Sequence, residues 1–170
     1  MKNKITICIC TNNRKKKLKK SLSSIRGLND IKKFNVEIVL ISNDKLNYKK
    51  FLNFFSKSLK IRFFRESISG VSTSRNKILK ILRAEKSKYA AFIDDDCLVS
   101  KNWLVSMLDM LEKKNADIIT GPQISKSNNI FLKLMERHQP HEIRTNWAST
   151  NNVFFKVSVL RNRIVFSNKL

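Results

Sequence analysis

Two patterns of apolar positions alternate along this chain. Short, nearly continuous apolar runs are typical of strands buried on both faces of a sheet, and they cover residues 5–10, 36–41, 60–66, 88–94 and 116–122. Between them, apolar residues recur every three or four positions, which predicts amphipathic helices, at residues 14–25, 48–59, 70–85 and 100–114. Strands that alternate with helices predict an α/β domain with a mainly parallel sheet.

The ends of these elements carry weaker signals. Gly27 is expected to end the first helix, and Ser100 is expected to cap the fourth helix at its start. After Pro122 the pattern weakens: residues 129–138 suggest a short helix and residues 147–156 an extended segment.

Charge changes the picture of what the chain binds. Its 35 Lys and Arg residues against 13 acids give a formal net charge of +22 over 170 residues. This balance favours polyanionic partners such as nucleic acid, anionic lipid or phosphorylated ligands, although AT-rich coding would give the same composition without any selected partner. The basic run at residues 14–20 has no interleaved aromatics, and the chain has no nucleic-acid-binding motif. A solvated or membrane-facing surface is therefore preferred to a specific nucleic-acid site.

The three cysteines indicate in which cellular compartment the chain works. Cys8, Cys10 and Cys97 form no C-x-x-C pair, and their number does not suit a disulfide framework. Reduced, buried cysteines are expected. No segment approaches the roughly 18 apolar residues of a membrane span, and the first residues do not resemble a signal peptide. We expect a cytoplasmic protein whose basic surface could touch the inner face of an anionic membrane.

Three aspartates, Asp94, Asp95 and Asp96, come at the end of the apolar run 88–94. Carboxylates this close repel one another and need a compensating cation. In an extended chain Asp94 and Asp96 would point to one side and Asp95 to the other. Two carboxylates on one side could hold a hard divalent cation such as Mg²⁺ or Mn²⁺. An acidic loop that only caps a helix is the alternative, but the position after a buried strand favours the cation.

Polar groups also follow the first two strands, T-N-N-R at 11–14 and S-N-D at 42–44. Ligands of parallel sheets bind at the carboxyl ends of the strands, where these groups should meet the aspartates. Gly70 would permit an unusual turn before the third helix. Arg75 in that helix could pair with a phosphate oxygen or with a carboxylate such as Asp96; the alternative is a solvated helix arginine.

Taken in order, these segments resemble the family 2 glycosyltransferases, which have the GT-A fold. The resemblance runs through nearly the whole chain, and its segments are ITICICTNNRKKKLKKSLSSI, VEIVLISND, GVSTSRNKIL, YAAFIDDDC with its D-x-D motif, ADIITGPQI and WASTNNVFFKVSVL. It implies a Rossmann-like α/β sheet flanked by helices. It also implies metal-dependent transfer of a sugar from a nucleotide-diphospho-sugar, such as a UDP-sugar, to a hydroxyl of a glycan or lipid-linked acceptor. Polysaccharide biosynthesis is a common setting in the family.

The resemblance also implies roles for individual residues. It implies that the nucleotide-sugar is held by Thr11, Arg14, Asp44, Arg75, Asp94 and Asp95. Among these, Thr11 and Asp44 would hold the nucleoside, and Arg75 would lie by the uracil or diphosphate. Asp96, together with Asp94, would hold the Mg²⁺ or Mn²⁺. On the acceptor side it implies Trp147, Asn151 and Asn152.

The sequence departs from the family pattern in three places. Asn12 stands where many members have an aromatic, and Ser42 and Asn43 replace frequent acids. The sequence ends at R-I-V-F-S-N-K-L, before a match to the glycine-rich E-D motif that supplies the catalytic base. We therefore expect residues 1–122 to form the nucleotide-sugar-binding half and residues 123–170 an incomplete start of the acceptor half, inactive in transfer by itself.

A second hypothesis belongs to another class of protein. In it the chain is a basic module that binds RNA or an anionic membrane without catalysis, and the aspartates are structural. It predicts polyanion binding that weakens steeply with salt and is indifferent to Asp96 and to divalent cations.

Overall fold

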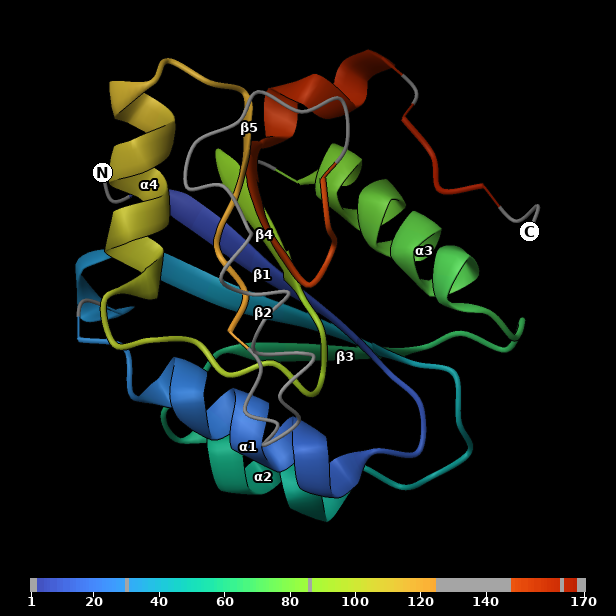
Figure 1. Ribbon diagram of the computed structural model, residues 1–170. Helices are drawn as coiled ribbons and strands as arrows, with labels where there is room; N and C mark the ends of the chain where they lie inside the picture. The colour runs from blue at the N-terminus through green and yellow to red at the C-terminus, as the bar shows by residue number, and fades with distance from the viewer. Residues whose placement is uncertain (1–2, 30, 86, 125–147, 163, 168–170) are drawn as a thin grey trace, which may run out of the picture.

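The computed structural model describes residues 3–29, 31–85, 87–124, 148–162 and 164–167. Strands and helices alternate as the apolar pattern predicts (Figure 1). In chain order the elements are β1 (Lys4–Thr11), α1 (Lys15–Arg26), a 3-10 turn (Ile31–Lys33), β2 (Asn35–Ser42), α2 (Lys49–Ser56), β3 (Ile61–Arg65), α3 (Val71–Ala84), β4 (Tyr89–Ile93), α4 (Trp103–Lys113), β5 (Ile118–Thr120), β6 (Asn152–Lys156) and a second 3-10 segment (Val157–Asn162).

The strands form one six-stranded sheet in the order β3-β2-β1-β4-β6-β5. β1 pairs in parallel with β2 and with β4, and β2 pairs in parallel with β3. β6 runs antiparallel between β4 and β5. The prediction of a mainly parallel sheet is confirmed. The expected division at residue 122 falls between β5 and β6, which are neighbours in this sheet.

Helices cover both faces of the sheet, which explains why the central strands are mainly apolar on both sides. Ile5, Ile7 and Ile9 of β1 face one core, to which α1, α2 and α4 contribute. Cys8 faces the opposite core, which is closed by α3 and the second 3-10 segment. Cys10 packs against this second core and is, with Cys97, only partly buried. All three cysteines are free thiols.

The predicted cap of the fourth helix is wrong. α4 begins at Trp103, and Ser100 contributes its carbonyl oxygen to the Trp103 N–H rather than a hydroxyl. The helix starts late because the residues before it are bound to α1 and to the loop that follows α1: Val99 N–H donates to Ser24 Oγ, and Asn102 Oδ1 accepts from Asn29 Nδ2.

The last third of the chain is described only in part. The expected short helix at 129–138 lies outside the described residues. The expected extended segment at 147–156 is confirmed over β6. No helix in the described ranges is both long and apolar enough to cross a bilayer.

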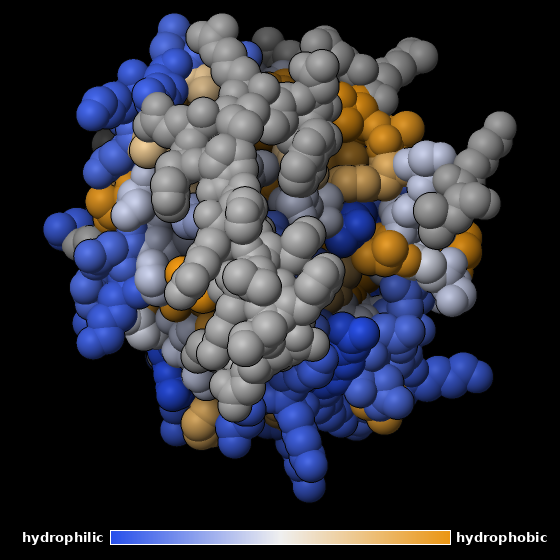
Figure 2. All heavy atoms as spheres, viewed as in Figure 1, coloured by the Kyte–Doolittle hydropathy of each residue, from blue (hydrophilic) through white to orange (hydrophobic). Residues whose placement is uncertain are grey.

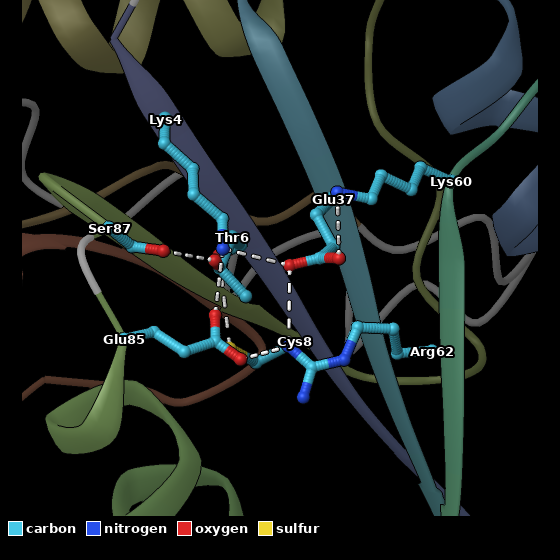
Figure 3. A network of polar contacts seen from close by, with 8 residues as sticks. All are labelled: Lys4, Thr6, Cys8, Glu37, Lys60, Arg62, Glu85 and Ser87. Atoms are coloured by element: carbon cyan, nitrogen blue, oxygen red, sulfur yellow. Dashed lines mark hydrogen bonds and ion pairs between the residues drawn. The ribbon is translucent and has the colours of Figure 1, made fainter.

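A charged network that the sequence analysis did not predict lies at the amino ends of the central strands (Figure 3). Glu37 of β2 has only 2% of its side chain exposed, and it lies 3.0 Å from Lys4 Nζ and 3.2 Å from Lys60 Nζ. Arg62 pairs with both Glu37 and Glu85, and Lys4 also contacts Glu85 at 2.9 Å. The buried Glu37 and the partly buried Glu85 therefore each have cationic partners, which offset the cost of removing a carboxylate from water.

Candidate functional site

The candidate site lies at the opposite ends of these strands, where β1, β2 and β4 finish. Its most buried contact joins β1 to the aspartates: Thr11 Oγ1 donates a 2.6 Å hydrogen bond to Asp95 Oδ2, and both residues are buried. Burial raises the pKa of Asp95 above its ordinary value, while the Thr11 hydroxyl and the charge of Arg14 oppose that rise. Asp95 is thus a structural anchor of the acidic turn.

Cations from two helices surround the other two aspartates. Arg14 Nη1, just before α1, lies 3.4 Å from Asp96 Oδ2, and Lys17 Nζ lies 3.1 Å from the same oxygen. Arg14 also lies 3.6 Å from Asp95 Oδ1. From α3, Arg75 Nη2 lies 3.5 Å from Asp94 Oδ1. The three negative charges of the site are therefore paired with three basic side chains.

The expected alternation of the aspartates is wrong, because the strand stops before them. β4 ends at Ile93 and residues 95–96 form a turn, which the Cys97 N–H closes on the Asp94 carbonyl. Asp94 then meets α3 and Asp96 meets α1, on opposite faces of the sheet. Arg75 was expected to pair with a phosphate oxygen or with a carboxylate such as Asp96, and it pairs with the carboxylate of Asp94 instead of that of Asp96.

Asp44 ties two loops of the site together. Its carboxylate accepts hydrogen bonds from Asn13 N–H at 2.6 Å, Leu46 N–H at 2.7 Å and Tyr48 O–H at 2.7 Å. Asn13 has a φ of 55°, a left-handed conformation that asparagine tolerates. Burial alone would raise the pKa of Asp44, but these hydrogen bonds hold it below its ordinary value. A direct contact of Asp44 with a nucleoside stays a prediction.

An open groove of about 480 Å³ runs beside the start of α1. Its lining is strongly basic and consists of Asn13, Arg14, Lys15, Lys16, Lys17 and Leu46. The sequence predicts solvated surface for most of this basic run and does not indicate a role for Lys17. The available signal was spacing, since Arg14 and Lys17 are three residues apart and therefore lie on one side of a helix. Such a lining suits an anionic ligand.

Asn43, which the sequence presents only as a polar residue in place of a frequent acid, joins the end of β2 to the start of α3. Its Nδ2 donates to the Ile68 carbonyl at 2.8 Å, and its Oδ1 accepts from the Ser74 hydroxyl. The unusual turn expected at Gly70 is confirmed, since its φ is 124°, where a side chain would be strained. These contacts fix where α3 begins and so where Arg75 points.

The two expected acceptor-side asparagines lie beside the end of β4, because Asn152 is paired with Ile93. Asn152 Oδ1 accepts from Trp103 Nε1 at 2.8 Å, and Asn152 Nδ2 donates to the Pro122 carbonyl at 3.1 Å. The Asn151 amide pairs with that of Gln123. Both amides thus bind the chain itself, and their role toward an acceptor stays a prediction. Trp147 lies outside the described residues.

Asp94 and Asp96 are the carboxylates that could reach a metal ion. Their side chains are 42% and 38% exposed, whereas Asp95 is buried. Within the described ranges, no group of three or more His, Cys, Asp or Glu residues could hold a metal ion by itself. A divalent cation that is bound with a nucleotide needs only one or two carboxylates, since phosphate oxygens and water complete its shell. Because Asp94 and Asp96 face helices on opposite sides of the sheet, either one could supply a single carboxylate to a cation of that kind.

Comparison with known proteins supplies the family. The family model for glycosyl transferase family 2 matches residues 6–162. An uncharacterized glycosyltransferase, R363, of Acanthamoeba polyphaga mimivirus is 31% identical over 105 residues, which are 59% of this chain and 41% of that protein.

Solved structures agree in fold. The structure of S. aureus TarS 1-349 is 16% identical with a TM-score of 0.69, over 98% of this chain and 51% of that one. The mannosyltransferase PcManGT of Pyrobaculum calidifontis is 14% identical with a TM-score of 0.72, over 100% of this chain and 49% of that one. This chain spans about half the length of these proteins, and its fold is the GT-A fold. With a family match that reaches from β1 to the second 3-10 segment, the chain belongs to glycosyl transferase family 2.

Proposed function

We propose that this chain binds a nucleotide-diphospho-sugar together with Mg²⁺ or Mn²⁺, for transfer of the sugar to a hydroxyl of a glycan or lipid-linked acceptor. The observation that carries the proposal is the meeting of Asp94 and Asp96 with Arg14, Lys17 and Arg75 at the carboxyl edge of the sheet. Structures similar to this chain include TarS in complex with UDP-GlcNAc and PcManGT in complex with GDP-Man and Mn²⁺. These support a UDP- or GDP-linked donor.

The basic side chains suit the chemistry of such a donor. When the glycosidic bond to the nucleotide breaks, negative charge grows on the leaving diphosphate, and Arg14, Lys17 and Arg75 would stabilise it. Asp96, or Asp94 beside Arg75, would supply a carboxylate to the divalent cation, which adds further positive charge when bound. The acceptor hydroxyl that attacks the anomeric carbon must lose a proton to a base. We assign that role to none of the described residues.

Calorimetric titration of UDP and of GDP, with and without Mn²⁺, tests the donor site. Replacing Asp96 with Asn should weaken Mn²⁺-dependent binding at least tenfold, a loss of about 1.4 kcal/mol. Asp117→Asn is the matched control. Asp117 is also an exposed carboxylate paired with a lysine, Lys156 at 3.0 Å, but it lies at the β5 edge of the sheet. Asp117→Asn should leave binding unchanged.

Two outcomes would contradict parts of this proposal. If UDP binding by the Asp96→Asn variant depends on Mn²⁺ as strongly as before, Asp96 is not a ligand of the cation. Polyanion binding that falls steeply with salt and ignores both Mn²⁺ and Asp96 would favour the basic binding module instead.

A second candidate activity, contact with an anionic membrane, rests on the surface of α1 and α2. These helices carry six and two basic residues respectively and no acidic one. Phe54 of α2 is 57% exposed, with Lys19 and Arg26 over its ring. Figure 2 shows hydrophilic side chains across the lower part of the view, where these helices lie. Basic helices with an exposed aromatic suit the headgroup region of anionic lipid.

Sedimentation with vesicles of phosphatidylglycerol and phosphatidylcholine tests the membrane contact. The chain should bind the mixed vesicles at low salt and not vesicles of phosphatidylcholine alone. Lys16→Glu with Lys20→Glu should release it, since both lysines are exposed on α1. Binding that survives this double reversal would place the contact elsewhere.

A further inference from the structure

The segment after β6 is attached to α3 by side chains that bind its main chain. Asn76 Nδ2 donates to the Phe166 carbonyl at 2.9 Å, and the Phe166 N–H donates back to Asn76 Oδ1 at 2.7 Å. Further along α3, Arg83 Nε donates to the Leu160 carbonyl at 3.1 Å, and its Nη2 donates to the Ile164 carbonyl. The segment therefore runs along α3, as Figure 1 shows, with a defined register.

This register places the Phe166 ring between the second core and the candidate site. The ring centroid lies 5.8 Å from that of Phe92 in an edge-to-face arrangement. The guanidinium carbon of Arg75 lies 5.5 Å from the Phe166 ring centroid. Arg75 also reaches Asp94, so its guanidinium has the ring and a carboxylate as partners.

A guanidinium with two such partners is restrained in a way that a solvated arginine is not. A free arginine side chain has many rotamers, and their loss must be offset when it binds a ligand. An aromatic face attracts a cation and, when it is fixed by its own backbone contacts, limits where that cation can lie. The Asn76 pair fixes the backbone of Phe166 in this way.

We propose that Phe166 is a positioning residue of the donor site, which holds the guanidinium of Arg75 beside Asp94 so that it is oriented for a nucleoside diphosphate. This inference rests on the proposed function. The competing explanation is that Phe166 only fills space against Phe92. The two explanations make different demands on residue 166. Filling space needs only an apolar side chain of similar size, whereas holding the guanidinium of Arg75 needs an aromatic face.

Titration of UDP with Mn²⁺ into ring-altered variants separates them. Phe166→Leu keeps an apolar side chain but removes the aromatic face, and it should weaken UDP binding about fivefold, the effect of losing about 1 kcal/mol. Phe166→Tyr restores the ring and should bind within about twofold of the unaltered chain. Phe54→Leu is the matched control: Phe54 also has basic side chains over its ring, but it lies on α2. It should bind UDP as the unaltered chain does.

A double-mutant cycle tests whether Phe166 acts through Arg75. With Arg75→Met already in place, adding Phe166→Leu should cost no further affinity, because the interaction it removes is gone. Additive losses, or equal binding by the Phe166→Leu variant and the unaltered chain, would overturn the inference and leave the proposed function standing.

A measurement without ligand distinguishes failure of the proposed donor binding from failure of the positioning role of Phe166. The ring should shift the NMR resonance of the Arg75 Nε–H group, and Phe166→Leu should remove that shift while Phe166→Tyr keeps it. If the unaltered chain binds neither UDP nor GDP, the proposed function fails, and the donor-positioning role fails with it. If the Arg75 resonance is also unmoved by Phe166→Leu, the ring does not hold the arginine at all.

Discussion

Thr11 and Asp95 are 84 positions apart in the chain, and their side chains share a buried 2.6 Å hydrogen bond at the carboxyl end of the sheet. This bond fastens the acidic turn after β4 to the end of β1. It also fixes the only aspartate of the three that is buried. Arg14, which follows Thr11 by three residues, is thereby held beside both Asp95 and Asp96.

Replacing Thr11 with Val should therefore affect stability and binding together. The substitution keeps the β-branched shape and leaves the Asp95 carboxylate without its closest donor, which should lower the free energy of unfolding by about 1–3 kcal/mol. A less restrained acidic turn should also weaken Mn²⁺-dependent UDP binding by about tenfold. Urea unfolding and calorimetric titration measure the two effects.

Thr6→Val is the matched control for this prediction. Thr6 lies on the same strand, is buried, and shares a 2.7 Å hydrogen bond with the Ser87 hydroxyl at the other end of the sheet. Its loss should reduce stability and leave nucleotide affinity unchanged. Equal losses of affinity in the two variants would mean that Thr11 acts only through general stability.

The apolar pattern predicted the sheet well because both of its faces are covered. β4 is apolar at every position and β1 at all but Lys4, Thr6 and Thr11, and such runs are typical of central strands. The positions of α1 and α3 follow from their three- and four-residue spacing. The start of α4 was wrong because the side chains of Ser24 and Asn29, distant in sequence, set the conformation of the residues before it.

The candidate site could be predicted in its location but not in its contacts. Carboxyl ends of parallel strands meet at one edge, so the sequence placed the aspartates near Thr11 and Asp44. Which aspartate meets which cation depends on a turn after Ile93 and on the faces that α1 and α3 cover. The contact of Phe166 with Arg75 was not predicted, since it depends on how Asn76 binds the backbone of a segment 90 positions away.

The charged network around Glu37 predicts acid sensitivity. Burial alone would raise the pKa of Glu37, but the hydrogen bonds and charges of Lys4 and Lys60 hold it below its ordinary value of 4.5. A carboxyl whose pKa is lower in the folded state stabilises the fold above its unfolded pKa. That contribution is lost as the pH falls below about 4.5 and through the folded pKa. Thermal unfolding between pH 7 and pH 3 should show this loss.

Replacing Glu37 with Gln tests the assignment. The substitution removes the buried charge that pairs with Lys4, Lys60 and Arg62. Because Lys60 and Arg62 are 63% and 38% exposed, water screens part of the effect, and the free energy of unfolding at pH 7 should fall by about 1–2 kcal/mol. It should also reduce the dependence of stability on pH below about 4.5, with Glu85 retaining the remainder, since the pKa of Glu85 is lowered too. A surface pair gives the control: Asp117, 69% exposed, should lose under about 1 kcal/mol as Asn. An unchanged pH profile in Glu37→Gln would assign the acid sensitivity to other groups.

Gly121 is expected to reject any side chain because of how closely it approaches Asn152. A Cβ atom there would lie 2.3 Å from Asn152 Nδ2, and the Asn152 amide is already held by Trp103 and by the Pro122 carbonyl. Gly121→Ala should therefore displace Asn152 and lower the free energy of unfolding by about 1–3 kcal/mol.

Gly27→Ala is the control, since Gly27 has a φ of −83° and the atom nearest to an added Cβ would lie 3.4 Å away. An alanine there should be neutral or stabilise by up to about 1 kcal/mol, through the smaller entropy of the unfolded chain. Urea unfolding of both variants measures the difference, and equal stabilities would show that the β5–β6 connection can move aside at Asn152.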